Sequence, residues 1–176
     1  ELELPFGIRA SGYLPKLPDC TLESRHLGLV TAAEVAGLRE KLQQLAAAAE
    51  KSIDFDTLLA LADAAPPLDF TPPPLPEPGA PVRIGVARDK AFCFYYEDSL
   101  SLLEQLGAEL VPFRPLEDAA LPENLQGLYL GGGYPELYAG ALSANKPMRQ
   151  SVRRAVTAGL PCIAECGGFM YLTDAI

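Results

Sequence analysis

A proline-rich run divides the chain into two parts. Residues 65–81 read Ala-Pro-Pro-Leu-Asp-Phe-Thr-Pro-Pro-Pro-Leu-Pro-Glu-Pro-Gly-Ala-Pro and hold nearly half of the chain's 17 prolines. Because proline has no backbone N–H and a fixed φ, such a run sustains neither a helix nor a sheet ladder. We therefore predict a linker at residues 65–81, between one piece at residues 1–64 and a second piece at residues 82–176.

The composition argues against several classes of partner. The formal net charge is -9 at pH 7, whereas binding to nucleic-acid phosphates or to an anionic membrane needs clustered Lys and Arg. No apolar run approaches the ~20 residues that a membrane-spanning helix requires, and the N-terminus lacks the pattern of a signal peptide. The sequence predicts a soluble, cytoplasmic protein with no nucleic-acid and no membrane partner.

The four cysteines, Cys20, Cys93, Cys162 and Cys166, are scattered along the chain. This spacing is unlike that of small disulfide-stabilised secreted domains, so we expect reduced thiols. Cys162 and Cys166 are close in sequence, but no further Cys or His lies nearby to complete a metal site, and no metal is predicted. His26 is the single histidine.

The N-terminal piece predicts one short strand at residues 8–14 and two helices. Thr31 and Glu34 have the spacing of a capping box, and the second helix is expected at residues 56–64. The first helix carries one apolar stripe at intervals of three and four, formed by Val35, Leu38, Leu42, Leu45 and Ala49. One strand and two helices, without a glycine loop for phosphate, hardly form a self-sufficient domain, so this piece is interpreted as the tail of something larger.

The C-terminal piece alternates strands and helices, which predicts a parallel sheet covered by helices. Gly107 and Gly159 have the positions of helix C-caps, and Asn145 can cap the helix that follows it. In open parallel sheets the functional site lies beyond the carboxyl ends of the strands. The expected elements, in order, are residues 83–87, 97–106, 109–113, 127–130, 147–158, 162–164 and a final helix.

A glycine-rich run, Gly131-Gly132-Gly133-Tyr134-Pro135-Glu136, follows the strand predicted at residues 127–130. Three glycines permit positive φ angles and let backbone N–H groups approach a ligand closely. A tight turn after a strand would also explain them. Because no Lys-Ser or Lys-Thr follows, a P-loop is excluded.

A second motif, Glu165-Cys166-Gly167-Gly168, joins an apolar strand to a predicted helix. We call this sharp strand-to-helix turn the elbow. A helix start directs unsatisfied N–H groups at the thiol and favours the thiolate. A buried structural cysteine is the alternative, but Gly167 and Gly168 lower helix propensity and indicate crowding around a ligand or a strained turn. We favour Cys166 as a nucleophile, with an oxyanion hole formed by the N–H of Gly167 and one from residues 131–133. The Glu165 carboxylate should point away from the thiolate.

Four aromatic residues, Phe92, Phe94, Tyr95 and Tyr96, follow the first strand of the C-terminal piece. A loop that packs over the sheet would account for them. Alternatively, Tyr95 or Tyr96 lines the path between the domains or contacts a large apolar substrate.

Residues 84–172 resemble the glutamine amidotransferase domain of the cobyrinic acid a,c-diamide synthases, ligases of the cobalamin pathway. The N-terminal piece is similar to the end of the family's ATP-dependent synthetase domain, through Gly12-Tyr13-Leu14-Pro15 and Arg25-His26-Leu27-Gly28-Leu29-Val30. In the C-terminal piece the resemblance is carried by Ala91-Phe92-Cys93-Phe94-Tyr95-Tyr96, Gly107-Ala108-Glu109, Leu128-Tyr129-Leu130-Gly131-Gly132-Gly133-Tyr134-Pro135-Glu136-Leu137 and Ala164-Glu165-Cys166-Gly167-Gly168-Phe169-Met170-Tyr171-Leu172.

The resemblance implies an α/β fold: an incomplete, flavodoxin-like parallel sheet of the class I glutamine amidotransferase type. It would follow the C-terminal tail of a P-loop, dethiobiotin synthetase-like domain. Cys166 would attack the side-chain amide of glutamine, with the oxyanion on the N–H groups of Gly133 and Gly167. The ammonia would amidate the a and c carboxylates of a corrin polycarboxylate, activated with ATP and Mg²⁺ at a site mostly outside this chain. The remaining residues of the implied glutamine-site loop are Gly131, Gly132, Tyr134, Pro135 and Glu136.

The family's histidine and its acidic partner lie well beyond the nucleophile, and His26 does not correspond to that histidine. Arg25 and His26 are instead candidates for contact with the synthetase substrate or the domain interface. We expect this chain to be an internal fragment with no amidation activity and negligible glutaminase activity. Its incomplete sheet would leave an exposed edge, so self-association, for example as a homodimer, is also expected.

Three alternatives stay open at this stage. The same chemistry could act on hydrogenobyrinic acid or nickel sirohydrochlorin. A cysteine hydrolase without a synthetase partner is disfavoured by the proline linker. A catalytically silent binding module would not explain why Cys166 lies between two glycine-rich elements.

Overall fold

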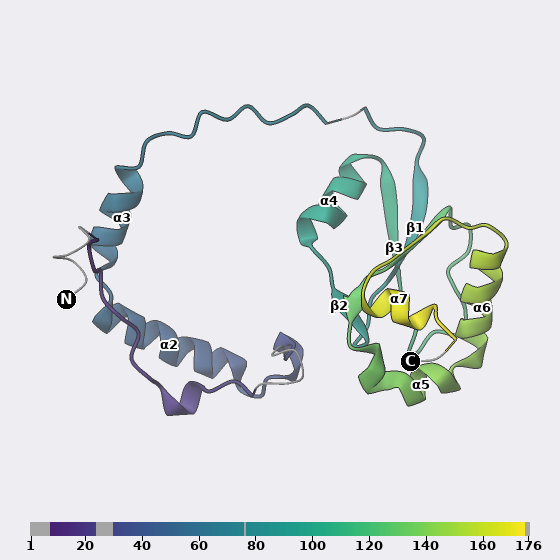
Figure 1. Cartoon of the computed structure of the whole chain (residues 1–176), viewed down its shortest axis with the longest axis horizontal. Helices are drawn as coiled ribbons and strands as arrows, with labels where there is room; N and C mark the ends of the chain where they lie inside the picture. The colour runs from purple at the N-terminus through teal and green to yellow at the C-terminus, as the bar shows by residue number, and fades with distance from the viewer. Residues whose placement is uncertain (1–7, 24–29, 76, 175–176) are drawn as a thin grey trace. The chain divides into compact units, whose positions relative to one another are not determined.

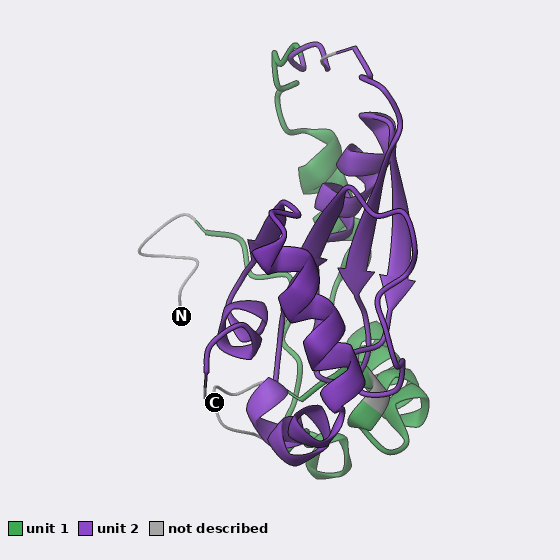
Figure 2. Ribbon diagram, turned by 90° about the vertical axis from the view of Figure 1, so that its right-hand side faces the viewer, with its two compact units in different colours: residues 1–71 green, residues 72–176 purple. Residues whose placement is uncertain are grey.

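The structure is a computed structural model that describes residues 8–23, 30–75 and 77–174. It contains two compact units, residues 1–71 and residues 72–176 (Figure 2). The boundary between them falls inside the proline-rich run. Residues 65–75 and 77–81 belong to no helix or strand, as the proline content predicts.

The N-terminal unit is helical. Its main elements are α2, Leu38–Ser52, and α3, Phe55–Asp63 (Figure 1). Among the described residues before α2, two segments form short 3₁₀ turns, η1 at Pro18–Cys20 and η3 at Ala32–Glu34. Both predicted helices are confirmed.

The first helix begins later than the sequence predicted. The Glu34 carboxylate accepts a hydrogen bond from the Thr31 N–H at 3.3 Å, so the predicted contact exists. It closes η3, however, and not α2. Gly37 then adopts a left-handed conformation with φ 63°, which interrupts the helical run because a continuing helix needs a negative φ. Val35 therefore lies outside the helix whose apolar stripe it was expected to join.

The strand predicted at residues 8–14 is wrong. The described part of that segment makes one isolated antiparallel bridge, between Gly12 and Ile53. Gly12 has φ 122°, and a Cβ there would lie 2.1 Å from the Ser52 carbonyl oxygen. The backbone thus packs directly on the end of α2, and a single bridge forms where a ladder was expected.

The C-terminal unit is built on a four-stranded parallel sheet with strand order β3-β1-β4-β6. The sheet confirms the predicted α/β class, and four of the predicted segments form its strands. These are β1 at Val82–Ala87, β3 at Ala108–Phe113, β4 at Gly127–Leu130 and β6 at Cys162–Ala164.

Helices α4, Glu97–Gln105, and α6, Lys146–Thr157, lie on opposite sides of this sheet (Figure 1). The predicted caps are confirmed. Gly107 and Gly159 follow the two helices with φ 98° and 91°. The Asn145 side chain accepts a hydrogen bond from the backbone N–H in the first turn of α6, at 3.4 Å.

Four short elements were not predicted. Strands β2, Phe92–Phe94, and β5, Gly132–Gly133, pair antiparallel, where the sequence predicted loops. The 3₁₀ turn η4, Pro135–Tyr138, and helix α5, Ala139–Ala144, follow β5. Because two glycines carry no strand propensity, β5 depends on the approach of the β2 backbone, which is a tertiary effect.

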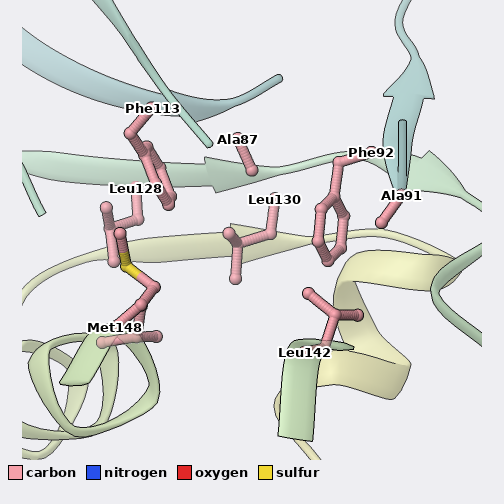
Figure 3. Close-up of a cluster of buried hydrophobic side chains, with 9 residues drawn as sticks. Ala87, Ala91, Phe92, Phe113, Leu128, Leu130, Leu142 and Met148 are labelled. Carbon is pink, nitrogen blue, oxygen red and sulfur yellow. The ribbon is translucent and has the colours of Figure 1, made fainter. Parts of the chain in front are cut away.

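The core lies between the sheet and helices α5 and α6. Figure 3 shows Phe113, Leu128 and Leu130 on the strands, directed toward Leu142 of α5 and Met148 of α6. Leu128 and Leu130 are 2% and 0% exposed. This packing fixes β4 close to the point where it runs into the glycine-rich segment.

Candidate active site

Cys166 occupies the turn between β6 and α7, Gly167–Tyr171. Its φ is 47° and its ψ is -110°, a conformation that is strained for a residue with a Cβ. The residue is exposed, so the alternative of a buried structural cysteine is wrong. A strained, solvent-accessible thiol at a strand end is the arrangement expected of a nucleophile.

The backbone holds this elbow at both ends. The Glu165 N–H donates to the Leu130 carbonyl oxygen at 2.9 Å, which ties β6 to the end of β4. The Gly168 N–H donates to the Glu165 carbonyl oxygen at 2.8 Å, and the Met170 N–H donates to that of Cys166 at 3.1 Å. Cys166 is therefore fixed by backbone hydrogen bonds on each side.

The glycine loop, residues 131–133, lies against the elbow. A Cβ placed on Gly132 would be 3.7 Å from the Cys166 Cβ, and one placed on Gly167 would be 3.2 Å from the Gly133 nitrogen. The structure thus brings together the two segments that the sequence assigns to one site. The use of the Gly133 and Gly167 N–H groups as an oxyanion hole stays a prediction.

The two glycines after Cys166 are needed because the chain itself fills the space around them. A Cβ on Gly167 would be 2.8 Å from Pro135 Cδ. A Cβ on Gly168 would be 2.1 Å from the Leu130 carbonyl oxygen. The sequence offered crowding by a ligand or a strained turn, and the structure supports the strained turn, closely packed on β4 and the glycine loop.

The rest of the predicted glutamine-site loop is mostly packing. Tyr134 is 3% exposed and Pro135 is buried, whereas Glu136 is exposed. The Tyr134 ring meets Phe94 edge-on with ring centroids 5.2 Å apart, and its N–H donates to the Ala91 carbonyl oxygen at 3.0 Å. Glu136 is thus the side chain of this run that solvent can reach.

Tyr95 and Tyr96 have different surroundings. The half-buried Tyr95 hydroxyl accepts a hydrogen bond from the Gly131 N–H at 2.9 Å and donates to the Ala87 carbonyl oxygen. Burial raises the pKa of Tyr95 to about 12. Its contacts favour packing over substrate contact, whereas Tyr96 is 81% exposed and its role stays a prediction. Arg25 and His26 lie outside the described residues.

Sequence reasoning did not identify Tyr129 as part of the site. Its hydroxyl donates to Glu165 Oε2 at 2.8 Å, so the carboxylate beside Cys166 is engaged by a neighbouring strand. Burial, followed by this hydrogen bond, raises the pKa of Tyr129 to about 12. Strand periodicity places Glu165 on the same side as Ile163, but only the register of β4 against β6, in which Tyr129 pairs with Ile163, brings the two side chains together.

Asp89 was also missed. Its carboxylate accepts hydrogen bonds from the N–H groups of Ala91 at 2.8 Å, Phe92 at 3.2 Å and Leu116 at 2.8 Å. Burial raises the pKa of this carboxyl above its ordinary value. An Asp followed closely by N–H groups that turn back on it is an Asx-turn pattern. Its effect is to fix the turn between β1 and β2, next to the glycine loop.

Two properties of the described residues bear on other functions. None of the helices in the described segments has the length and apolar character needed to cross a bilayer. In the same segments, no three His, Cys, Asp or Glu side chains gather in a way that could hold a metal ion.

Comparison with known proteins gives the family. Residues 83–176, more than half of the chain, match the CobB/CobQ-like glutamine amidotransferase domain. The chain belongs to this family. The matched segment begins in β1 and contains both the glycine loop and the elbow, so the amidotransferase-like fold is confirmed for the C-terminal unit.

Curated relatives extend the similarity to nearly the whole chain. The cobyrinate a,c-diamide synthase of Dehalococcoides mccartyi strain 195 is 48% identical over 94% of this chain and 36% of its own length. The hydrogenobyrinate a,c-diamide synthase of Stutzerimonas stutzeri is 49% identical over 98% of this chain and 39% of its own length. The cobyrinate a,c-diamide synthase of Priestia megaterium is 44% identical over 99% of this chain and 38% of its own length.

These relatives confirm the resemblance to cobyrinic acid a,c-diamide synthases. The chain spans little more than a third of the length of each of them. No solved structure gives a significant match.

Proposed function

We propose that this chain is part of a longer enzyme that uses glutamine as the nitrogen donor to amidate the a- and c-side-chain carboxylates of cobyrinic acid. The family membership and the names of the relatives support glutamine-dependent amidation in cobalamin synthesis. One structural observation carries the residue-level proposal: exposed Cys166 sits in a strained elbow directly against the glycine loop.

In the proposed reaction the Cys166 thiolate adds to the carboxamide carbon of glutamine. The carbonyl oxygen becomes an oxyanion, which the N–H groups of Gly133 and Gly167 stabilise. The carbon–nitrogen bond then breaks, the leaving nitrogen takes up a proton, and ammonia departs from a glutamyl thioester. Water adds to the thioester, the carbon–sulfur bond breaks, and glutamate is released with the thiol restored. Loss of one oxyanion donor typically costs about 10²–10³ in rate.

The amidation itself belongs to a second site. The residues of this chain do not fit a nucleotide, because its glycine loop continues as Tyr134-Pro135-Glu136 without the Lys-Ser or Lys-Thr of a P-loop. ATP, with Mg²⁺, supplies the activation of the corrin carboxylate and would be held by residues outside this chain. The N-terminal unit is proposed to be the C-terminal tail of that synthetase domain. Passage of ammonia inside the protein would keep it from being protonated by solvent.

The proposal is tested in the full-length protein by comparing glutamine and ammonium salts as nitrogen donors. Cys166→Ser should abolish glutamine-dependent amidation, with a loss of at least about 10³-fold, and leave ammonia-dependent amidation at the wild-type rate. Cys93→Ser is the matched control, since Cys93 is also exposed, and should keep both activities. Glutamine-dependent amidation that survives in Cys166→Ser would overturn the assignment, and a wild-type protein inactive with both donors would favour a silent binding module.

A second substrate is favoured by a specific observation. The hydrogenobyrinate and cobyrinate synthases match this chain with nearly equal identity, 49% and 48%. The cobalt-free corrin is therefore the second candidate. A competition assay with equal concentrations of the two acids distinguishes them, because the preferred substrate is diamidated first.

A further inference from the structure

Two tyrosines connect the glycine loop to the Cys166 elbow. We propose that Tyr95 and Tyr129 are positioning residues that hold these two halves of the glutaminase site at a fixed separation. The inference rests on the proposed function. It adds a role for two side chains that do not themselves react.

Tyr95 holds the glycine loop at its first residue. Its hydroxyl accepts the Gly131 N–H at 2.9 Å and donates to the carbonyl oxygen of Ala87, the last residue of β1. A Cβ on Gly131 would be 2.5 Å from the Tyr95 ring, so the loop backbone lies directly on that ring. One hydroxyl therefore joins the end of β1 to the loop, two residues before Gly133.

Tyr129 holds the elbow from the other side. Its hydroxyl donates to Glu165 Oε2 at 2.8 Å, one residue before Cys166. The Glu165 N–H is already bonded to the Leu130 carbonyl oxygen at 2.9 Å. Glu165 is thus fixed through both its backbone and its side chain, which limits the movement of the residue that follows it.

The two rings contact each other edge-on. Their centroids are 5.2 Å apart and their planes meet at 87°, a favourable geometry for an aromatic pair. Two hydroxyl groups that bond to different parts of the site are thereby joined through one aromatic contact. Burial raises the pKa of each tyrosine to about 12, so both hydroxyls keep their protons at neutral pH and can donate.

A role in apolar packing alone would need the rings and not the hydroxyls. In this pair, however, both hydroxyls bond to residues that adjoin the catalytic groups: Gly131 in the glycine loop and Glu165 in the elbow. Small errors in such positions matter, because a displacement of about 1 Å at a reacting centre can cost roughly 10²-fold in rate.

The test uses Tyr95→Phe and Tyr129→Phe in the full-length protein, because Phe keeps each ring and removes its hydroxyl. The kcat for glutamine hydrolysis should fall by about tenfold or more in each variant, toward the ~10²-fold cost of misplacement. The KM for glutamine and the ammonia-dependent amidation rate should stay at the wild-type values. Equal losses of the glutamine-dependent and ammonia-dependent activities would overturn the proposal, because they would indicate a general structural role, and so would an unchanged kcat.

Three further variants sharpen this result. Tyr171→Phe is the control, because the Tyr171 hydroxyl is buried and has no hydrogen-bond partner among the described residues. It should keep the wild-type kcat. Glu165→Gln keeps an oxygen that can accept from Tyr129 and should remain near wild type, whereas Glu165→Ala should reproduce the loss seen in Tyr129→Phe. A loss in Glu165→Gln as large as in Glu165→Ala would contradict positioning through this hydrogen bond.

Amide exchange tests the same geometry without any enzymatic activity. In the chain itself, Tyr95→Phe should speed exchange of the Gly131 amide, since that N–H loses its acceptor, and Tyr171→Phe should not. Unchanged exchange in Tyr95→Phe would overturn the contact. Absence of glutamine hydrolysis in the wild-type full-length protein would instead refute the proposed function, which separates the two failures.

Discussion

The two units of the chain differ in what their apolar side chains contact. In the C-terminal unit, Leu128 and Leu130 are 2% and 0% exposed. In the N-terminal unit, no described residue of α2 or α3 is buried, and Leu42 and Leu59 are 54% and 63% exposed. Both units carry helices with the expected periodicity, so periodicity predicts a helix without predicting a core around it.

The candidate site follows the same division. The elbow and the glycine loop extend from strands that the core holds, and a site of this kind needs a rigid support. In the N-terminal unit, the exposed apolar side chains of α2 and α3 are those that other parts of a larger fold would cover. This agrees with the interpretation of that unit as the tail of a synthetase domain, which stays a proposal.

The largest expected difference between the units is in the cost of removing a leucine side chain. Leu130→Ala should lower the free energy of unfolding of the C-terminal unit by about 2–5 kcal/mol, because it opens a cavity in a packed core. Leu59→Ala, its exposed counterpart in α3, should change stability by no more than about 0.5 kcal/mol. Urea unfolding of both variants measures this, and equal costs would contradict the contrast between the buried core of the C-terminal unit and helices α2 and α3, in which no described residue is buried.

A pair of glycines tests how tightly the elbow is packed. Gly168→Ala should cost about 1–3 kcal/mol, since the new Cβ would overpack the end of β4, 2.1 Å from the Leu130 carbonyl oxygen. Gly140→Ala in α5, where a Cβ would meet nothing within 4 Å, should instead be neutral or stabilising by up to about 1 kcal/mol. Thermal unfolding of the two variants compares them. If the Gly168→Ala variant unfolds at the wild-type temperature, the elbow is less tightly packed than the structure indicates.

The pKa values of two aspartates are shifted in opposite directions. Burial raises the pKa of Asp89, so its contribution to stability is present below the ordinary pKa of 3.8 and is lost as the pH rises through its higher folded value. Hydrogen bonds from Thr57 lower the pKa of Asp54, the N-cap of α3. Its contribution is present above 3.8 and is lost as the pH falls through its lower folded value.

Carboxyl carbon chemical shifts followed from neutral to acidic pH give both midpoints. The Asp89 midpoint should lie above that of Asp54. Coincident midpoints would show that Asp89 is as solvated as the exposed helix cap, and that the turn between β1 and β2 is not fixed in the way described.

Much of the fold is predictable from local sequence signals. Gly107, Gly159 and Asn145 mark helix ends because each has a local geometric requirement that the neighbouring residues reveal. Strand β5 and the late start of α2 could not be read in the same way. The first depends on the approach of β2, and the second on a left-handed Gly37 whose conformation the capping-box pattern does not encode.

The position of the candidate site was predictable from the sequence, but the side-chain contacts around it were not. Cys166 and the glycine loop are recognisable because each follows an apolar strand directly. The hydrogen bond between Tyr129 and Glu165 joins β4 to the residue that follows β6, so its detection needs the register of β4 against β6. Tyr95 was singled out with Tyr96 for the path between the domains or for substrate contact, but its bonds to Gly131 and Ala87 were not predicted, because these two backbone partners come from different elements.

The role of Cys166 as the nucleophile is tested most directly by treating the full-length protein with a diazoketone analogue of glutamine and locating the labelled residue. The analogue places a reactive carbon where the carboxamide would lie, so a bound molecule alkylates the nucleophile. We expect a single label, on Cys166, that excess glutamine prevents. Labelling of Cys93 or Cys20 to the same extent, or labelling of Cys166 that glutamine does not slow, would contradict it.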